Sequence, residues 1–173
     1  MNKHYETLEL DKVLDMLKNE TSCPDAADLA LNIKPSSDFI TVCNLLNQTE
    51  DALSLLARFG APSFSGLKNV NNALTRANAG GSLNTVELLN IAYTLRSIRT
   101  LYEWRSHCSG VSTSLDFLFE CITVNKYLED RIFSCIIGED EIADKASELL
   151  FDIRRKISSS ISNIRSRLDK LVK

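Results

Sequence analysis

The sequence contains no apolar run that approaches the roughly 18 residues required for a membrane-spanning helix. The residues after Met1 are polar or charged, so the hydrophobic stretch of a signal peptide is also absent. The first absence excludes an integral membrane protein, and the second argues against secretion. Together they predict a cytoplasmic protein without a membrane partner.

Histidine is scarce, and there is no Cys-x-x-Cys pair. His4 and His107 are the only histidines, whereas a zinc site needs three or four converging ligands. His107 and Cys108 are adjacent, so on a helix they diverge by about 100° and cannot share one ion. No helix N-terminus that would lower the pKa of a thiol is expected near His107, the one realistic base. The odd number and wide spacing of the cysteines predict reduced, mostly buried thiols at Cys23, Cys43, Cys108, Cys121 and Cys135.

A phosphate-binding glycine loop is missing as well. Gly80-Gly81 is not followed by Gly-Lys-Ser/Thr, and Gly66-Leu67-Lys68 lacks the first glycine and the hydroxyl residue of a P-loop. We interpret Glu139-Asp140-Glu141 as a solvated turn and Trp104 as a residue packed on a neighbouring helix. The sequence therefore predicts no catalytic, cofactor-binding or metal-binding residue within the chain.

What the sequence does contain is a succession of helix signals. The 44% apolar and 25% charged residues are ordinary for a globular protein. A short helix is expected around Val13–Leu17. Ser22 is expected to cap a second helix that starts at Pro24 and is broken before Pro35. Ser36-Ser37-Asp38 should start a third, which ends at Gly60.

The second half continues in the same way. A short helical turn is expected at 73–79. Asn84 and Glu87 have capping-box spacing and should start a long helix that ends near Cys108. Two more helices are expected at about 112–122 and 125–136, and β-branched residues on either side of a turn predict a small hairpin at 135–143. The predicted fold is an all-α helical bundle with a long protruding C-terminal helix.

The C-terminal helix has the pattern of a coiled coil. Ser147 is its expected cap, and no Pro or Gly occurs from 147 to 173. Its apolar residues recur at a mean spacing of 3.5, as in a coiled-coil seam. They are Leu150, Ile153, Ile157, Ile161, Ile164, Leu168 and Leu171. No stop signal follows, so the helix is expected to run on and to pair with a partner helix.

This helix is also the only basic element. Residues 152–173 carry seven Lys or Arg and two Asp, a net charge of +5, which leaves −8 for residues 1–151. Such an excess is typical of a nucleic-acid contact and also of a solvated coiled-coil flank. The candidate nucleic-acid contacts are Arg154, Arg155, Lys156, Arg165, Arg167 and Lys170.

Several short motifs follow one another in a specific order along the chain. The first are Thr7-Leu8-Glu9, Asp11-Lys12, Leu14, Leu31 through Lys34-Pro35, Thr49-Glu50, Ala52, Leu55-Leu56, and Pro62, Phe64 and Gly66 in the loop from Gly60. Further along they are Ala73-Leu74, Arg76-Ala77, Gly80-Gly81, Leu83, Glu87-Leu88, Ile91-Ala92, Leu95, Arg99, Gly138-Glu139, Asp144, Ala146-Ser147, Leu150 and Ile153-Arg154. In this order the motifs resemble the bacterial MutS-II family, the endonuclease MutS2 type. Cys23-Pro24-Asp25 and residues 105–126 depart from the family pattern.

The resemblance implies that residues 1–146 form a helical core and lever segment, and that residues 147–173 are the truncated ascending helix of a clamp. It implies a homodimeric parent with an ATPase that uses ATP and magnesium and an Smr endonuclease, both outside these residues. Family members bind mismatched, duplex or branched DNA and suppress homologous recombination, and some bind ribosomal RNA and rescue collided ribosomes. The expected role of this chain is to couple the ATPase to the clamp without catalysis.

The alternative is a standalone helical adaptor that recognises a partner helix through the seam at 150–171. A reading frame that continues past Lys173 into a P-loop would favour the MutS-II interpretation. A stop codon at that point would favour the adaptor.

Overall fold

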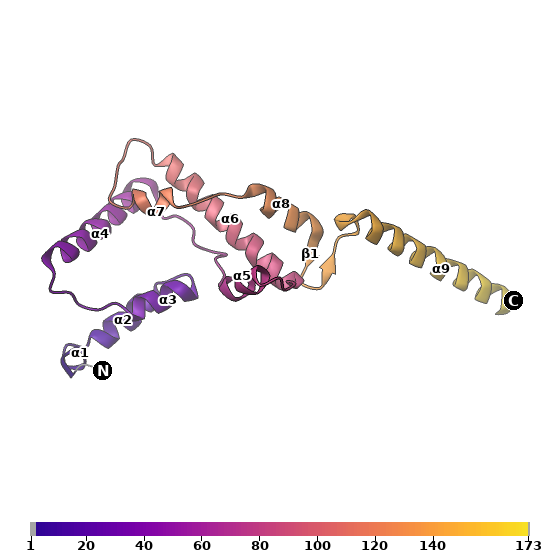
Figure 1. The fold of residues 1–173 in the computed structure, drawn as a ribbon, viewed down its shortest axis with the longest axis horizontal. Coiled ribbons are helices and arrows are strands. Elements are labelled where there is room, and N and C mark those ends of the chain that lie inside the picture. The colour runs from indigo at the N-terminus through magenta and orange to yellow at the C-terminus, as the bar shows by residue number, and fades with distance from the viewer. Residues whose placement is uncertain (1–2, 173) are drawn as a thin grey trace.

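The computed structural model describes residues 3–172, which form an elongated array of helices (Figure 1). In chain order the elements are α1 (Lys3–Thr7), α2 (Leu10–Asn19), α3 (Pro24–Leu31), α4 (Phe39–Phe59), α5 (Asn71–Asn78), α6 (Thr85–His107), α7 (Asp116–Glu120), α8 (Lys126–Cys135), β1 (Ile136–Gly138), β2 (Glu141–Ile142), the 3-10 turn η1 (Asp144–Ala146) and α9 (Glu148–Val172). The predicted all-α class, the small hairpin and the protruding last helix are confirmed.

The molecule exposes far more surface than a compact protein of its size. Its accessible surface is 13340 Å², whereas a compact monomer of this mass exposes about 8500 Å². Two helices account for much of the difference, since α4 has only Leu55 buried and α9 extends away from the other elements (Figure 1). Both helices therefore offer apolar faces that the described residues leave uncovered.

The core lies where α6 packs against α8 and the hairpin. Capping by Asn84 and Glu87 starts α6 as predicted: Asn84 Oδ1 accepts from Glu87 N at 2.8 Å, and Glu87 Oε2 accepts from Asn84 N at 2.9 Å. The apolar face of α6 that follows contains Ala92, which is completely buried. The buried cluster consists of Leu89, Ile91, Ala92, Ile132 and Ile136.

A buried carboxylate joins the same two helices. Glu129 of α8 is 2% exposed and accepts hydrogen bonds from Arg96 and Arg99 of α6. The bond from Arg99 is the main cause that holds the pKa of Glu129 below its ordinary value. Arg99 also pairs with Glu103 one turn along α6, at 2.9 Å, and the Arg96 guanidinium lies 4.0 Å from the centre of the Phe133 ring. The charge on Glu129 is thus compensated inside the α6–α8 interface.

The loop between α4 and α5 packs along α6. Ser97 Oγ donates to the Ser65 carbonyl at 2.7 Å, and Lys68 N donates to Thr94 Oγ1 at 3.2 Å. Gly66 lies between these contacts at φ +89°, and a Cβ there would stand 2.8 Å from Ser97 Oγ. Only glycine therefore allows this close approach without strain.

Side-chain hydrogen bonds attach the N-terminal helices to the rest. Asn69 donates to Asp25 of α3 at 2.6 Å. Asp51 of α4 accepts from the backbone and the hydroxyl of Ser114 at 2.7 and 2.6 Å. The Ser114 hydroxyl is the first cause that lowers the pKa of Asp51. Ala30 is the one buried residue of α3, and Leu55 is the one buried residue of α4.

Several local predictions need correction. Cys23, not Ser22, is the residue before α3, and its side chain makes no cap. The helix expected at 112–122 is reduced to α7, because Thr113 bonds to Asp116 and turns the preceding residues away from helical geometry. By contrast, Asp38 caps α4 by accepting from Thr41 N at 3.0 Å, and α4 ends at Gly60 as expected.

The cysteines are all free thiols, but the expectation that most are buried is wrong. Cys108 is buried, Cys121 is exposed, and the other three are half-buried. Cys23 and Cys43 lie next to α3 and in α4, which bury one residue each, whereas Cys135 packs partly against the core. Within residues 3–172, no helix has the length and apolar content needed to cross a membrane.

Candidate nucleic-acid interface

The basic helix α9 begins at a well-defined junction. The antiparallel hairpin pairs Ile136 with Ile142, and η1 and Ser147 follow it. Ser147 Oγ accepts from Leu150 N at 3.1 Å, which confirms the predicted cap. In the turn of the hairpin, the Glu139 carbonyl accepts a hydrogen bond from the Thr85 hydroxyl of α6. The base of α9 is therefore connected to the body through the hairpin.

One of the candidate nucleic-acid contacts has a different role. Arg154 Nη1 donates to the Ile142 carbonyl at 2.8 Å and forms an ion pair with Asp144. The guanidinium thus connects the first turns of α9 to the hairpin and η1. The sequence did not predict this bond, since Asp144 and Arg154 lie ten positions apart across a turn. We call this contact the Arg154 bracket.

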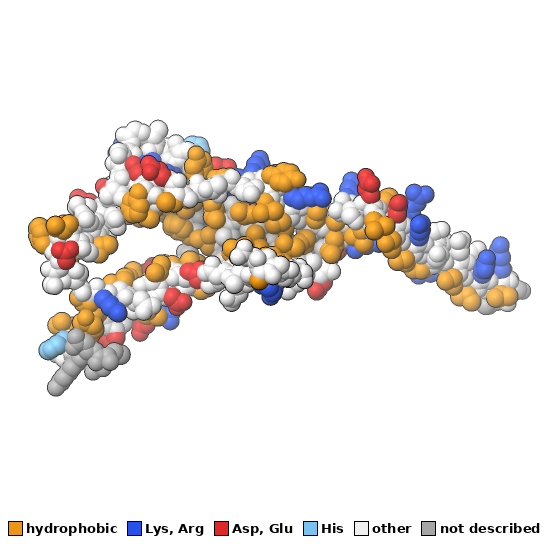
Figure 2. All heavy atoms as spheres, in the orientation of Figure 1, with side chains coloured by type: hydrophobic (Ala, Val, Ile, Leu, Met, Phe, Trp, Pro, Cys, Tyr) orange, Lys and Arg blue, Asp and Glu red, His pale blue; other side chains and the backbone are white. Residues whose placement is uncertain are grey.

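The predicted seam is exposed along most of α9. Leu150 is half-buried. From Ile153 onward every seam residue is at least 44% exposed. Figure 2 shows these hydrophobic side chains along one edge of α9, with Lys and Arg side chains on the opposite edge. An apolar edge of this length is typical of a surface that contacts another element.

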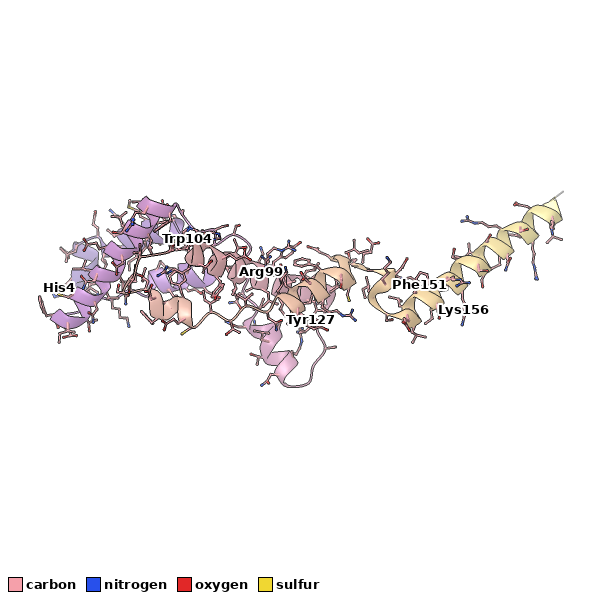
Figure 3. All side chains as sticks on the ribbon, turned by 90° about the horizontal axis from the view of Figure 1, so that it is seen from above. His4, Arg99, Trp104, Tyr127, Phe151 and Lys156 are labelled. Carbon is pink, nitrogen blue, oxygen red and sulfur yellow. The ribbon has the colours of Figure 1, made fainter. Side chains whose placement is uncertain are left out.

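The other basic candidates are exposed and unpaired. Among residues 3–172, no hydrogen bond or ion pair involves the side chains of Arg155, Lys156, Arg165, Arg167 and Lys170. Lys156 lies on α9 well away from Arg99 and Trp104 of the body (Figure 3). These five cations are available to an external partner. A polar strip with Ser158, Ser159, Ser162 and Asn163 accompanies them.

The residues that the sequence analysis considered and set aside as active-site candidates, His107, Cys108 and Trp104, have structural roles. His107 Nδ1 lies 2.6 Å from the Glu103 carbonyl, while Cys108 Sγ donates to the Trp104 carbonyl at 3.4 Å, so the two do not converge. Trp104 packs beside Phe119 of α7, with ring centres 6.3 Å apart. Within the described part of the chain, no group of three His, Cys, Asp or Glu side chains is arranged to hold a metal ion.

Gly80 and Gly81 end α5 and do not form a phosphate loop. Gly81 N donates to the Arg76 carbonyl at 2.9 Å and Gly80 N to the Ala77 carbonyl at 2.9 Å. This bond pattern, with Gly80 at φ +83°, is the Schellman arrangement of a helix end. The Arg76 side chain pairs with Glu87 at the start of α6.

Comparison with known proteins connects this fold to one family. No protein-family model matches the chain. It is 35% identical, over 99% of its length, to the endonuclease MutS2 of Ruminiclostridium cellulolyticum. The identity is 38% to the endonuclease MutS2 of Agathobacter rectalis and 34% to that of Acetivibrio thermocellus, again over 99% of the chain. The chain belongs to the MutS2 family.

The chain spans 22% of the length of each of these MutS2 relatives. The endonuclease in their names is a property of those proteins. The similarity covers both the α6–α8 body and α9, so the motif order is a correct guide to family.

Proposed function

We propose that this chain is a non-catalytic structural segment of a MutS2-type nucleic-acid-binding ATPase. Residues 1–146 would be the core and lever, and residues 147–173 the ascending helix of a clamp. The whole protein would be a homodimer with an ATPase, which binds ATP and magnesium, and an endonuclease. It would act on mismatched or branched DNA in the suppression of homologous recombination, or on ribosomal RNA in the rescue of collided ribosomes.

The observation that carries this proposal is the state of α9. An exposed helix with five unpaired cations next to an uncovered apolar seam is suited to binding phosphates while it pairs with a second helix. The α6–α8 body supplies a stiff base, since a buried ion-pair cluster and a hydrophobic core join its two helices. Movement of the body would therefore be transmitted to α9 through the hairpin and the Arg154 bracket.

The experiment replaces the five free cations of α9 by Gln in one variant and measures binding of labelled duplex and four-way-junction DNA by anisotropy. The substitutions are Arg155→Gln, Lys156→Gln, Arg165→Gln, Arg167→Gln and Lys170→Gln. We expect affinity to fall by about tenfold or more at low salt, because each lost phosphate contact reduces the slope of log K against log salt by about 0.9. The assay is repeated with ribosomal RNA hairpins to compare the two substrate classes.

A matched control removes cations from the body. Lys18→Gln with Arg131→Gln changes two exposed side chains of α2 and α8 and should leave affinity and salt slope within about twofold of the parent. Equal affinity and slope for the parent and the five-site variant would contradict the phosphate-contact role. A loss as large in the body control would assign binding to the body.

The non-catalytic part of the proposal has its own measurement. The purified chain with ATP and magnesium should neither hydrolyse the nucleotide nor nick supercoiled plasmid. Turnover that elutes with the chain and survives a second purification would contradict it.

The standalone adaptor is the second candidate, and the same uncovered seam favours it. Sequencing of the gene past Lys173 separates the two functions. A continuing frame that encodes a Gly-x-x-x-x-Gly-Lys-Ser/Thr loop agrees with the clamp, whereas a stop codon agrees with the adaptor.

A further inference from the structure

The cations of α9 fall into two groups when their positions around the helix are compared with the seam. At about 100° per residue, Arg165 lies to one side of the seam, while Lys156 and Arg167 lie to the other, each about 75–100° from its midline. Arg155 and Lys170 are more than about 130° away, on the far face. We call Lys156, Arg165 and Arg167 the flank cations, and Arg155 and Lys170 the outer cations.

The flanks of the seam carry no acidic residue. From Asp152 to Leu171 the only acids are Asp152 and Asp169, and both lie about 120–140° from the midline, with the outer cations. Arg154, which is also beside the seam, is already occupied by the Arg154 bracket. The seam is thus bordered by positive charge on both sides.

This border disfavours a second copy of α9 as the partner. Flanking positions of two paired helices face each other, and their charges determine which helices associate. A pair of α9 helices would bring these cation-bearing flanks together and would set no carboxylate against Lys156, Arg165 or Arg167, because neither flank carries one. Like charges at such positions are destabilising, so self-pairing would be weak at low salt.

We propose that the seam of α9 is covered by a partner helix whose own flanking positions carry Asp or Glu. This inference rests on the proposed function in taking a second helix as the occupant, and it adds the charge of that helix. The acidic flanks would pair with Lys156, Arg165 and Arg167, while Arg155 and Lys170 stay exposed for phosphate. Partner recognition and nucleic-acid contact would then use different cations of the same helix.

The test measures binding of the chain to labelled synthetic helical peptides of about 25 residues that share one Leu/Ile seam. The flanks are Glu in one peptide, Ser in a second and Lys in a third. At about 50 mM NaCl the Glu-flanked peptide should bind about tenfold or more tightly than the Lys-flanked one, and the difference should shrink at about 500 mM.

A pair of charge-reversed variants identifies the cations. Arg165→Glu with Arg167→Glu should weaken binding of the Glu-flanked peptide by about three- to tenfold and strengthen that of the Lys-flanked peptide. Arg155→Glu with Lys170→Glu makes the same charge change on the far face and should leave both peptide affinities unchanged. In the DNA assay the Arg155→Glu, Lys170→Glu variant should lose more affinity than the Arg165→Glu, Arg167→Glu variant.

The remaining outcomes overturn the inference in distinguishable ways. Equal binding of all three peptides would refute acidic flanks but leave the clamp pairing intact. If no peptide binds and sedimentation shows a concentration-dependent dimer, the seam is covered by a second copy of the chain. If no peptide binds and the chain is monomeric, helix pairing through the seam is refuted, and with it that part of the proposed function. A larger DNA defect in the Arg165/Arg167 variant would assign those residues to phosphate.

Discussion

Arg99 of α6 binds the buried carboxylate of Glu129 on α8 through two hydrogen bonds, from Nε to Oε2 at 2.9 Å and from Nη2 to Oε1 at 3.0 Å. This two-point geometry is stronger and more directional than a single contact. It raises the pKa of Arg99 and lowers that of Glu129, so both groups stay charged in the core. The relative position of α6 and α8 therefore depends on this pair as well as on apolar packing.

Removal of the Glu129 charge should destabilise the body. Glu129→Gln keeps the shape but removes the negative charge and replaces one acceptor oxygen by an NH2 group that faces the Arg96 and Arg99 guanidinium groups, and we expect a loss of about 1.5–3 kcal/mol in the free energy of unfolding. The matched control is Glu103→Gln, which removes the exposed partner of Arg99 and should cost about 0.5 kcal/mol or less. Urea unfolding followed by circular dichroism measures both, and equal losses would contradict a special role for Glu129.

The same pair predicts how stability responds to acid. The pKa of Glu129 in the folded protein lies below its ordinary value of 4.5. Its contribution is therefore complete above about pH 4.5 and is lost as pH falls through the lower folded value. Unfolding free energies at a series of pH values between neutral and acidic should fall less steeply in this window for Glu129→Gln than for the parent. Parallel curves would show that Glu129 does not titrate with folding.

The loop on α6 should not tolerate a side chain at Gly66. Gly66→Ala combines a positive φ with a Cβ 2.8 Å from Ser97 Oγ, which is held by the Ser65 and Tyr93 carbonyls. Gly80→Ala serves as control, because Gly80 also has a positive φ but has nothing within 4 Å of the added atom. We expect the free energy of unfolding to fall by about 1 kcal/mol in Gly80→Ala and by at least about 1 kcal/mol more in Gly66→Ala.

A second substitution checks the cause of that difference. Ser97→Ala removes the hydroxyl that a Cβ at residue 66 would meet. The loss in the Gly66→Ala, Ser97→Ala double variant should therefore be smaller than the sum of the two single losses. Additive losses would mean that the backbone conformation alone explains the cost.

The Arg154 bracket should control the first turns of α9. Arg154→Gln should accelerate hydrogen exchange of amides near the start of α9 by about two- to fivefold, as expected for a partly exposed ion pair. Arg155→Gln removes the same charge from the next residue, which has no described partner, and should leave exchange there unchanged. Similar acceleration in both variants would attribute the effect to net charge and not to the bracket.

Much of this architecture is predictable from local signals. Asp38 and Asn84 cap helices because their side chains accept bonds from free amides three residues on. Gly60 ends α4, and Ser147 starts α9, for similarly local reasons. The helix expected at 112–122 begins only at Asp116, because Asp116 binds Thr113 three residues earlier and also Arg105 of α6. The partner on α6 lies eleven positions away and leaves no periodic signal.

The sequence by itself determined the helical class, the seam and charge of α9, and the motif order that matches MutS2, since helix periodicity and capping depend on residues within a few positions of one another. Only the tertiary structure decided which charged groups are occupied. It pairs Glu129 with Arg99 and Arg154 with Asp144 across folded segments, and it leaves the remaining cations of α9 free. The physical reason is that an ion pair depends on distance in space, and separation along the chain does not encode that distance.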